Sequence, residues 1–237
     1  NLNANLQIVV AFRMLPKVVW EMPLLGTFNL HASLLPNYRG AAPINWAIIN
    51  GETKTGVTTF FIDDKIDTGA MILNAETPIG QNESAGELHD RLMQLGSETV
   101  IETLTIIEKG KVTTTIQQDN DDIKTAYKLN KENCKIDWTK PVAEIHNLIR
   151  GLSPYPAAWC FFSDKGEEWN VKLYQSTIVY EPHSFTIGQL VCSKKELKIA
   201  VREGFIQVES LQFPGKKKMN TAELLNGIQF SADAKAY

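Results

Sequence analysis

The stretch from residue 27 to residue 51 constrains the fold of this chain most, because it combines a strand pattern, a tight turn and a helix pattern within twenty-five residues. Residues 27–32 predict a strand, whose two-residue side-chain period places Asn29 and His31 on the same face. A segment rich in turn residues follows, and Pro43 then opens a helix pattern that ends at a glycine. An amide and an imidazole are therefore expected side by side at the end of a strand.

The segments on either side predict that this strand belongs to an α/β layer. Residues 6–12 form a short apolar run, typical of a strand that is buried on both faces of a parallel sheet. A short helix pattern begins at Pro16 and leads to the strand of Asn29 and His31, which makes a strand, crossover and strand unit. Two extended runs at 57–63 and 70–79 predict a hairpin, and the capping box at Ser84 opens a long helix.

The second half of the chain has a different pattern and predicts a second domain. Residues 1–110 are expected to form the α/β domain, residues 111–132 a polar linker, and residues 133–237 a second unit. From residue 159 onward, short alternating runs separated by turn residues predict a small closed sheet or barrel.

Charge and cysteine usage narrow the class of protein. The net charge is −3, with six basic against eleven acidic residues in 1–107 and eighteen against sixteen in 108–237. The C-terminal half is therefore the better candidate for contact with a polyanion. Three widely spaced cysteines without metal-ligand spacing fit a reducing compartment and predict no metal site. The sequence has no membrane-length apolar run and no signal-peptide pattern, so it predicts a soluble, cytoplasmic, bacterial protein, with an organellar matrix as the alternative.

Asn29, His31 and Asp67 form a candidate catalytic group if the hairpin returns its acidic loop to the strand. The amide and the imidazole can donate hydrogen bonds to an oxygen that becomes negative when a carbonyl is attacked. The carboxylate of Asp67 can orient the histidine, favour its charged form, or assist removal of a proton from an attacking amine. This combination suits acyl transfer between two bound substrates without a serine or cysteine nucleophile.

Each of these residues also has an ordinary structural explanation. A histidine in a strand is commonly a half-buried side chain, an asparagine near a turn commonly caps local structure, and an aspartate before Thr-Gly can form an Asx-turn. Residue types alone leave both interpretations open.

Four separated blocks of sequence resemble the formyltransferase family that uses 10-formyltetrahydrofolate. These blocks are the Asn29–His31 strand, the loop at 33–36, the Arg-Gly-Ala-Ala-Pro-Ile run at 39–44 and the Asp-Thr-Gly of 67–69. The resemblance implies that the asparagine, histidine and aspartate are catalytic. It also implies the fold, which is the C-terminal half of a Rossmann-like formyltransferase domain followed by a small OB-like β-barrel domain.

The C-terminal region resembles the tRNA-modifying members of that family. The segments Lys-Ile-Asp-Trp at 135–138, residues 146–159 and residues 215–227 carry this resemblance. It implies transfer of the formyl group to the α-amino group of methionine on initiator methionyl-tRNA, as required for translation initiation, by a monomer that uses no metal. The alternatives are a formyltransferase acting on an amino sugar nucleotide, glycinamide ribonucleotide or another small amine, and a non-catalytic relic that binds folate or RNA.

The resemblance also implies binding residues. The residues expected to bind the folate are Arg13, Met14, Leu15, Ser33, Leu34, Leu35, Pro36, Asp63 and Asp64. Those expected to contact tRNA phosphates are Lys128, Lys216, Lys217 and Lys218. Family members carry further strands and helices before the equivalent of Leu6, so the sequence is expected to lack an N-terminal portion.

Overall fold

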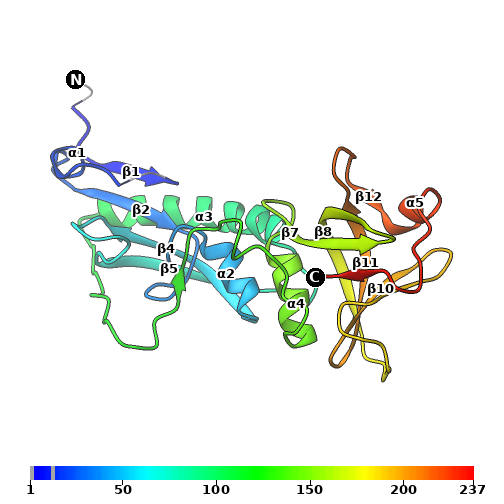
Figure 1. The fold of residues 1–237 in the computed structure, drawn as a ribbon. Coiled ribbons are helices and arrows are strands. Elements are labelled where there is room, and N and C mark those ends of the chain that lie inside the picture. Colours follow the sequence, from blue (N-terminus) through cyan, green and yellow to red (C-terminus); the bar gives the residue numbers. More distant parts are fainter. Residues whose placement is uncertain (1–2, 12–13) are drawn as a thin grey trace. The chain divides into compact units, whose positions relative to one another are not determined.

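A computed structural model describes residues 3–11 and 14–237, which divide into two units (Figure 1). The first unit contains residues 1–47, 52–80 and 87–128, and the second contains residues 48–51, 81–86 and 129–237. Up to residue 128 the elements are β1 (Gln7–Val10), α1 (Lys17–Trp20), β2 (Thr27–His31), β3 (Arg39–Gly40), α2 (Pro43–Ile49), β4 (Lys54–Phe61), β5 (Met71–Pro78), α3 (Ala85–Glu108) and β6 (Thr125–Ala126).

The first unit is built on a four-stranded mixed sheet with the order β1-β2-β4-β5. β1 and β2 are parallel, whereas β4 pairs antiparallel with both β2 and β5. Helix α3 lies along one face of this sheet (Figure 1), where Thr103 Oγ1 and Thr59 Oγ1 are 2.8 Å apart. Leu30 points to this same face and packs against Gly96, where even a methyl group would meet the leucine side chain at 2.7 Å. The α/β layer expected from the sequence is confirmed.

The prediction that the first apolar run is buried on both faces of the sheet is wrong. Val9 is buried, but 41% of Ile8 and 57% of Val10 are exposed. The reason is the position of β1, which within the described residues is an edge strand that pairs only with β2. The predicted parallel pairing itself is present.

The segment after α3 runs along the first unit rather than hanging free. Thr115 exchanges two backbone hydrogen bonds with Met71 at 2.9 Å each. Ten residues later, β6 pairs in parallel with β3, aligning Arg39 with Thr125 and Gly40 with Ala126. A stretch expected from its polarity to be a linker therefore has ordered partners in the first unit.

The second unit is an antiparallel barrel with two helices, α4 and α5. Its elements are α4 (Val142–Gly151), β7 (Ala158–Asp164), β8 (Glu167–Val179), β9 (Leu190–Cys192), β10 (Leu197–Val201), β11 (Gly204–Gln212), β12 (Met219–Asn220), α5 (Thr221–Leu225) and β13 (Lys235–Ala236). The strand order is β13-β7-β8-β11-β10-β9, with β12 paired to β11. The two outer strands meet where Leu190 N donates to Ala234 O and Ala236 N donates to Gly188 O, which closes the barrel.

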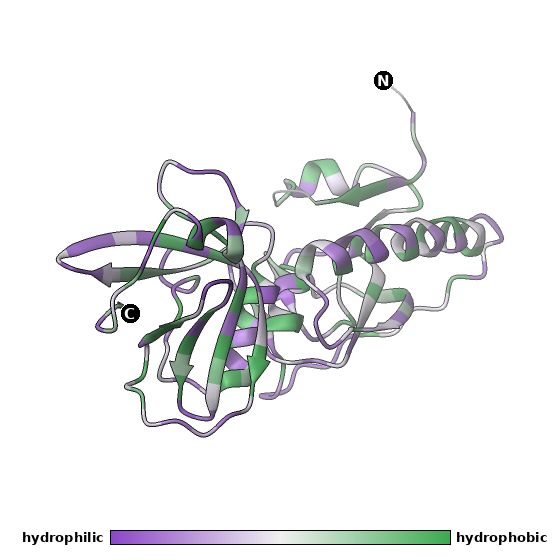
Figure 2. Ribbon diagram, turned by 90° about the vertical axis from the view of Figure 1, so that its right-hand side faces the viewer, coloured by the Kyte–Doolittle hydropathy of each residue, from purple (hydrophilic) through white to green (hydrophobic). Residues whose placement is uncertain are grey.

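Alternating side chains explain the core of this barrel. Hydrophilic and hydrophobic residues alternate along its strands (Figure 2), and every second residue of β7 is buried. Helix α4 contributes Val142, Ile145 and Ile149 to the same apolar cluster as Phe162 of β7. The barrel expected from the alternating sequence is therefore confirmed. No helix in the described part of the chain has both the length and the apolar character needed to cross a bilayer.

A buried histidine in the second unit predicts a pH-dependent stability. His146 is 5% exposed, and burial together with the charge of Arg150 lowers its pKa from 6.5 to about 4. Asn82 Oδ1 lies 3.2 Å from Nε2 and Ser176 Oγ 3.2 Å from Nδ1, so the neutral ring with hydrogen on Nε2 satisfies both partners.

We expect the free energy of unfolding to fall as the pH is lowered from about 6.5 to about 4. In this window the unfolded chain binds a proton at this histidine and the folded chain does not, so the loss is at most roughly 3 kcal/mol. Urea unfolding of the wild type and of His146→Gln at pH 7, 6, 5 and 4 measures this loss of unfolding free energy. The stability difference between the two proteins should shrink toward pH 4, whereas a constant difference would contradict the assignment.

Candidate active site

Strand β2 carries the first two candidate catalytic side chains at its carboxyl end. Asn29 is 3% exposed, and its Nδ2 donates to the backbone oxygen of Val9 on β1 at 2.8 Å. This hydrogen bond orients the amide and uses one of its two N–H groups. Among the described residues Nδ2 has no other acceptor, so its second N–H is not used within the protein.

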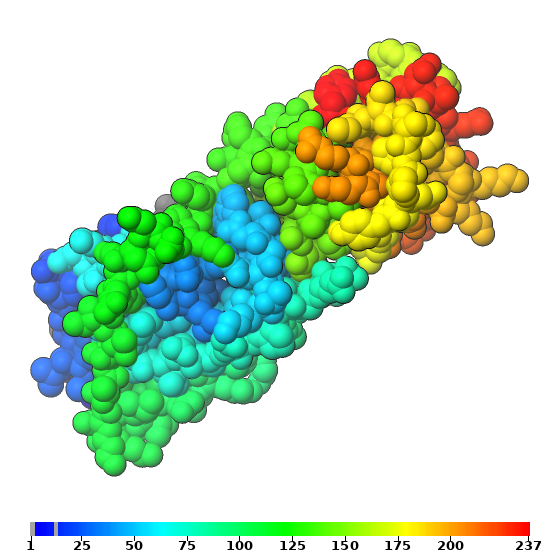
Figure 3. Space-filling model, turned by 90° about the horizontal axis from the view of Figure 1, so that it is seen from below, coloured from blue at the N-terminus to red at the C-terminus, as the bar shows by residue number. Residues whose placement is uncertain are grey.

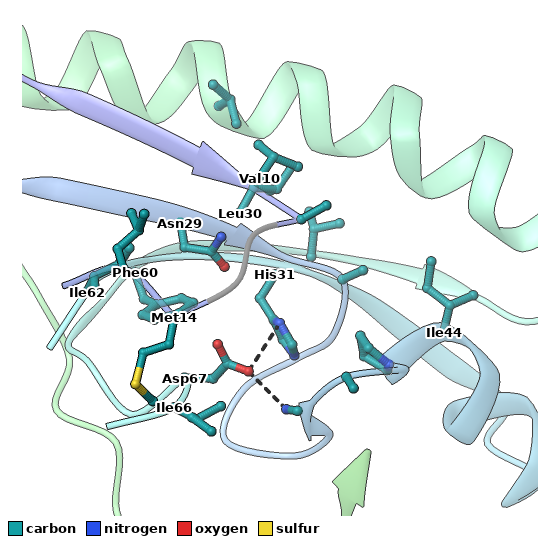
Figure 4. Close-up of a pocket in the computed structure, with 18 of the residues that line it drawn as sticks. Val10, Met14, Asn29, Leu30, His31, Ile44, Phe60, Ile62, Ile66 and Asp67 are labelled. Carbon is teal, nitrogen blue, oxygen red and sulfur yellow. Dashed lines mark hydrogen bonds and ion pairs between the residues drawn. The ribbon is translucent and has the colours of Figure 1, made fainter. Parts of the chain in front are cut away.

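His31 is held by the backbone of the turn that follows β2. Its Nε2 lies 2.8 Å from the backbone oxygen of Tyr38. Because a carbonyl oxygen only accepts, Nε2 must carry a hydrogen. The second ring nitrogen, Nδ1, faces Asp67 Oδ2 at 3.7 Å (Figure 4), and only 8% of the His31 side chain is exposed. Nδ1 is therefore the ring nitrogen that can take part in chemistry.

The loop between β4 and β5 delivers Asp67 to the histidine. Asp67 adopts the left-handed backbone conformation with φ of 55°, and its Oδ2 accepts a hydrogen bond from Gly40 N at 2.9 Å. Two residues later the chain passes so close to β4 that a Cβ on Gly69 would lie 1.7 Å from the Phe61 backbone oxygen. The Asp-Thr-Gly sequence thus turns the chain and presents the carboxylate to His31 (Figure 4) and to the backbone N–H of Gly40.

A cavity of about 1310 Å³ surrounds these three side chains within the first unit. Phe60 of β4 packs edge-on against the His31 ring with 6.5 Å between ring centroids, and forms part of the same wall. Leu30, on the opposite face of β2, lines the cavity as well (Figure 4), together with residues of helix α3. The cavity therefore has a polar part at Asn29, His31 and Asp67 and a larger apolar part around it.

Several of the residues predicted to bind folate lie in this cavity. Met14, Leu15, Asp63 and Asp64 line it. The two carboxylates come from the loop that also holds Asp67, and Asp63 Oδ1 accepts hydrogen bonds from Thr68 Oγ1 and Lys65 N. Arg13, also predicted to bind folate, lies outside the described residues.

The turn of residues 33–36 has a different environment from the one expected. None of its four residues, Ser33, Leu34, Leu35 and Pro36, is among the described residues that line the cavity. Ser33 is fully buried and donates to Asn37 O at 2.7 Å, and Leu35 N donates to Thr58 Oγ1 at 3.2 Å. These bonds hold the turn that carries Tyr38, and the predicted folate contact of this turn stays a prediction.

The lysines predicted to contact tRNA are all exposed. Lys216, Lys217 and Lys218 lie between β11 and β12, where Lys218 Nζ is 4.9 Å from the centre of the Tyr174 ring. Lys128 is exposed in the first unit. Their exposure is compatible with phosphate contacts but is also what a solvated lysine has.

A second basic and aromatic cluster was missed by sequence reasoning. Lys131 and Lys135 place their Nζ atoms 5.4 and 5.6 Å from the Trp159 ring centre, and Lys135 also lies 5.6 Å from that of Phe161. Alternating residues indicated a strand at β7, but nothing in the sequence indicated that two lysines from the preceding loop stack on the Trp159 ring of this strand. Within the described residues, no group of three or more His, Cys, Asp or Glu is placed to hold a metal ion.

Comparisons with known proteins agree on one family. The model of the formyl transferase family matches residues 1–104, and the model of the formyl transferase C-terminal domain matches residues 128–229. The chain is 75% identical over 236 residues to a methionyl-tRNA formyltransferase of Flavobacterium johnsoniae, covering 100% of this chain and 75% of that protein. It is 52% identical over 233 residues to a methionyl-tRNA formyltransferase of Bacteroides thetaiotaomicron, covering 96% and 72% respectively. The chain thus spans about three quarters of the length of these relatives.

Solved structures share the fold. An N-formyltransferase from Helicobacter canadensis, in complex with folinic acid and dTDP-3-aminofucose, superimposes with a TM-score of 0.60 and 26% identity over 76% of this chain and 64% of that one. HypX from Aquifex aeolicus superimposes with a TM-score of 0.71 over 96% of this chain and 40% of that one. At 22% identity the HypX likeness shows the fold alone.

Proposed function

Because this chain belongs to the formyl transferase family, we propose that it transfers a formyl group from 10-formyltetrahydrofolate to the α-amino group of methionine on initiator methionyl-tRNA. The observation that carries this proposal is the 75% identity to a methionyl-tRNA formyltransferase along the whole chain. The arrangement of Asn29, His31 and Asp67 around one cavity gives the proposal its chemistry.

The cavity fits a folate co-substrate. Apolar side chains such as Met14, Leu15 and Ile62 line it beside the carboxylates of Asp63 and Asp64. A pterin ring is flat and apolar on its faces and carries hydrogen-bond donors on its edge, which such a combination would accept. The folinic acid bound to the related N-formyltransferase from Helicobacter canadensis supports the same class of co-substrate.

Asn29 and His31 are proposed to stabilise negative charge on the formyl oxygen. The second N–H of Asn29 and Nδ1 of His31, which donates when it carries a hydrogen, are left for a substrate, since the first N–H of Asn29 and the Nε2–H of His31 are held by backbone carbonyls. Such preorganised donors act without reorganisation when charge develops, which makes them effective in a site shielded from water. The backbone partners Val9 O and Tyr38 O thus fix the direction of both donors.

Asp67 is proposed to assist removal of a proton from the attacking amine. Its carboxylate Oδ2 faces Nδ1 of His31 at 3.7 Å. That separation exceeds a hydrogen bond, so the carboxylate remains available to the attacking amine or to a water between the groups. No covalent enzyme intermediate is required, because the amine itself is the nucleophile.

The second unit is proposed to contact the tRNA. Two groups of its exposed lysines lie near aromatic rings, Lys216–Lys218, of which Lys218 lies over Tyr174, and Lys131 with Lys135 on Trp159. Lysines neutralise phosphates, and aromatic rings beside them offer a surface on which bases can stack. Lys128 of the first unit is proposed as a further phosphate contact.

An acceptor assay tests the function. The full-length protein is incubated with 10-formyltetrahydrofolate and methionyl initiator tRNA, an amino sugar nucleotide, or both at equal concentration, and the formylated products are quantified. We expect formylation of the methionyl-tRNA, with no competition from the sugar nucleotide at equal concentration. Formylation of the sugar nucleotide alone would overturn the proposal.

A further inference from the structure

The segment that follows α3, residues 109–126, lies on the first unit next to the turn that connects β2 to α2. Figure 3 shows it as a green band beside the blue residues of the β2 region, and the β3 and β6 pairing aligns Arg39–Gly40 with Thr125–Ala126. Within this polar, mostly exposed segment, Gln117 is an exception, because only 8% of it is exposed. A glutamine buried in an otherwise solvated stretch needs partners for its amide.

Gln117 uses its whole amide group to tie two loops together. Its Nε2 donates to the backbone oxygens of Asp67 and Gly69, at 2.9 Å each. Its Oε1 accepts from the guanidinium of Arg39, with 2.9 Å to Nε and 2.8 Å to Nη2. The remaining Arg39 donor, Nη1, pairs with Asp119 at 2.7 Å. One side chain therefore joins Arg39 to the backbone on both sides of Thr68.

One of the two loops joined by Gln117 carries the carboxylate of Asp67, and the other supplies one of its two contacts. Gly40, which follows Arg39, donates its N–H to Asp67 Oδ2 at 2.9 Å, and this same oxygen faces His31. Asp67 itself has φ of 55°, a conformation that costs a residue with a side chain about 1 kcal/mol and persists only where its surroundings hold it. The two hydrogen bonds from Gln117 supply that restraint.

We propose that Gln117 is a positioning residue for formyl transfer, which fixes the backbone of Asp67 and thereby the approach of its carboxylate to His31. The proposal rests on the proposed function, since it concerns the same site. Gln117 does not line the cavity among the described residues and touches no reacting group, so it acts through Asp67 alone. Residues that orient metal ligands through hydrogen bonds commonly contribute about 10–100-fold to activity, and we expect an effect of the same order here.

Gln117→Glu keeps the contact with Arg39 but removes the hydrogen bonds to the backbone oxygens of Asp67 and Gly69. The substituted carboxylate keeps the shape of glutamine and strengthens the bond to Arg39, but it removes both donors and opposes the carbonyls of Asp67 and Gly69. We expect kcat for methionyl-tRNA formylation to fall about 10–100-fold, with KM for the folate and Kd for the tRNA within about twofold of wild type. Thermal unfolding should show a folded protein. Gln118→Glu is the matched control, because the neighbouring glutamine is exposed and its variant should retain wild-type kcat.

A second variant, Gln117→Met, and hydrogen exchange of the backbone test the same role of Gln117. Gln117→Met has similar length, no charge and no donors, and should show the same loss of kcat. In both variants, hydrogen exchange of the backbone amides in residues 39–41 should become faster, because Gly40 N loses a fixed acceptor. A wild-type kcat or unchanged exchange in the folded Gln117 variants would overturn the proposal. Wild-type protein that shows no formylation would overturn the proposed function instead, while the exchange measurement still decides the role of Gln117.

Discussion

Replacing Asp67 with asparagine is expected to lower kcat for formyl transfer by roughly 10³-fold, within the range typical of acid–base groups. Asparagine keeps the size of the side chain, tolerates the φ of 55° at this position and can still accept from Gly40 N, so the loop should keep its shape. What disappears is the negative charge 3.7 Å from His31 Nδ1 and the group that can take a proton. Steady-state formylation of methionyl-tRNA by the full-length protein measures the change.

The matched control for this substitution is Asp121→Asn. Asp121 is exposed in the segment after α3, and its replacement should leave kcat within about twofold of wild type. Binding of the tRNA and KM for the folate should also be unchanged in Asp67→Asn, since the lost interaction belongs to the reacting groups. A kcat for Asp67→Asn within a few-fold of wild type would remove Asp67 from the catalytic group.

Adding a single methyl group at Gly69 is expected to destabilise the first unit by roughly 3 kcal/mol and to abolish most of the activity. The added Cβ would lie 1.7 Å from the Phe61 backbone oxygen, so the strand β4 or the loop must move. Movement of the loop also displaces the carbonyl that accepts from Gln117 and the carboxylate of Asp67 two residues earlier. Urea unfolding and formylation kinetics of Gly69→Ala measure both effects.

Gly227→Ala is the corresponding control, because its nearest atom would be Leu224 O at an ordinary contact distance of 3.8 Å. This variant should unfold within about 0.5 kcal/mol of wild type. If Gly69→Ala were as stable and as active as Gly227→Ala, the tight passage of the loop beside β4 would not be required for the site.

The convergence of Asn29 with His31 could be predicted, because strand periodicity alone puts alternate residues on one face. The hairpin that returns Asp67 to this place could also be predicted from two extended runs and a loop of turn residues. Identification of these residues as a group, however, depended on the resemblance to a family. Their catalytic roles stay predictions.

What anchors the histidine could not be predicted from the sequence. Tyr38 presents its backbone oxygen to His31 from a left-handed conformation with φ of 62°, and no residue pattern marks a tyrosine for that conformation. Gln117 was missed for a related reason, since it lies 50 residues after Asp67 in a segment without periodicity. Hydrogen bonds between a side chain and a distant backbone leave no local signal.

At the edge of the sheet, the sequence predicted more burial than the structure shows. The apolar run that became β1 predicted burial on both faces, but burial depends on what packs against a strand as well as on its residues. Within the described residues β1 has one neighbouring strand, and Ile8 and Val10 remain exposed.

The most direct test of the central claim is single-turnover formylation of methionyl initiator tRNA by the full-length protein and its His31→Ala variant, with 10-formyltetrahydrofolate in excess. We expect formyl-methionyl-tRNA with the wild type and a rate at least about 10²-fold lower with the variant, at unchanged tRNA affinity. Formylation at the wild-type rate by His31→Ala, or no formylation by the wild type, would contradict it.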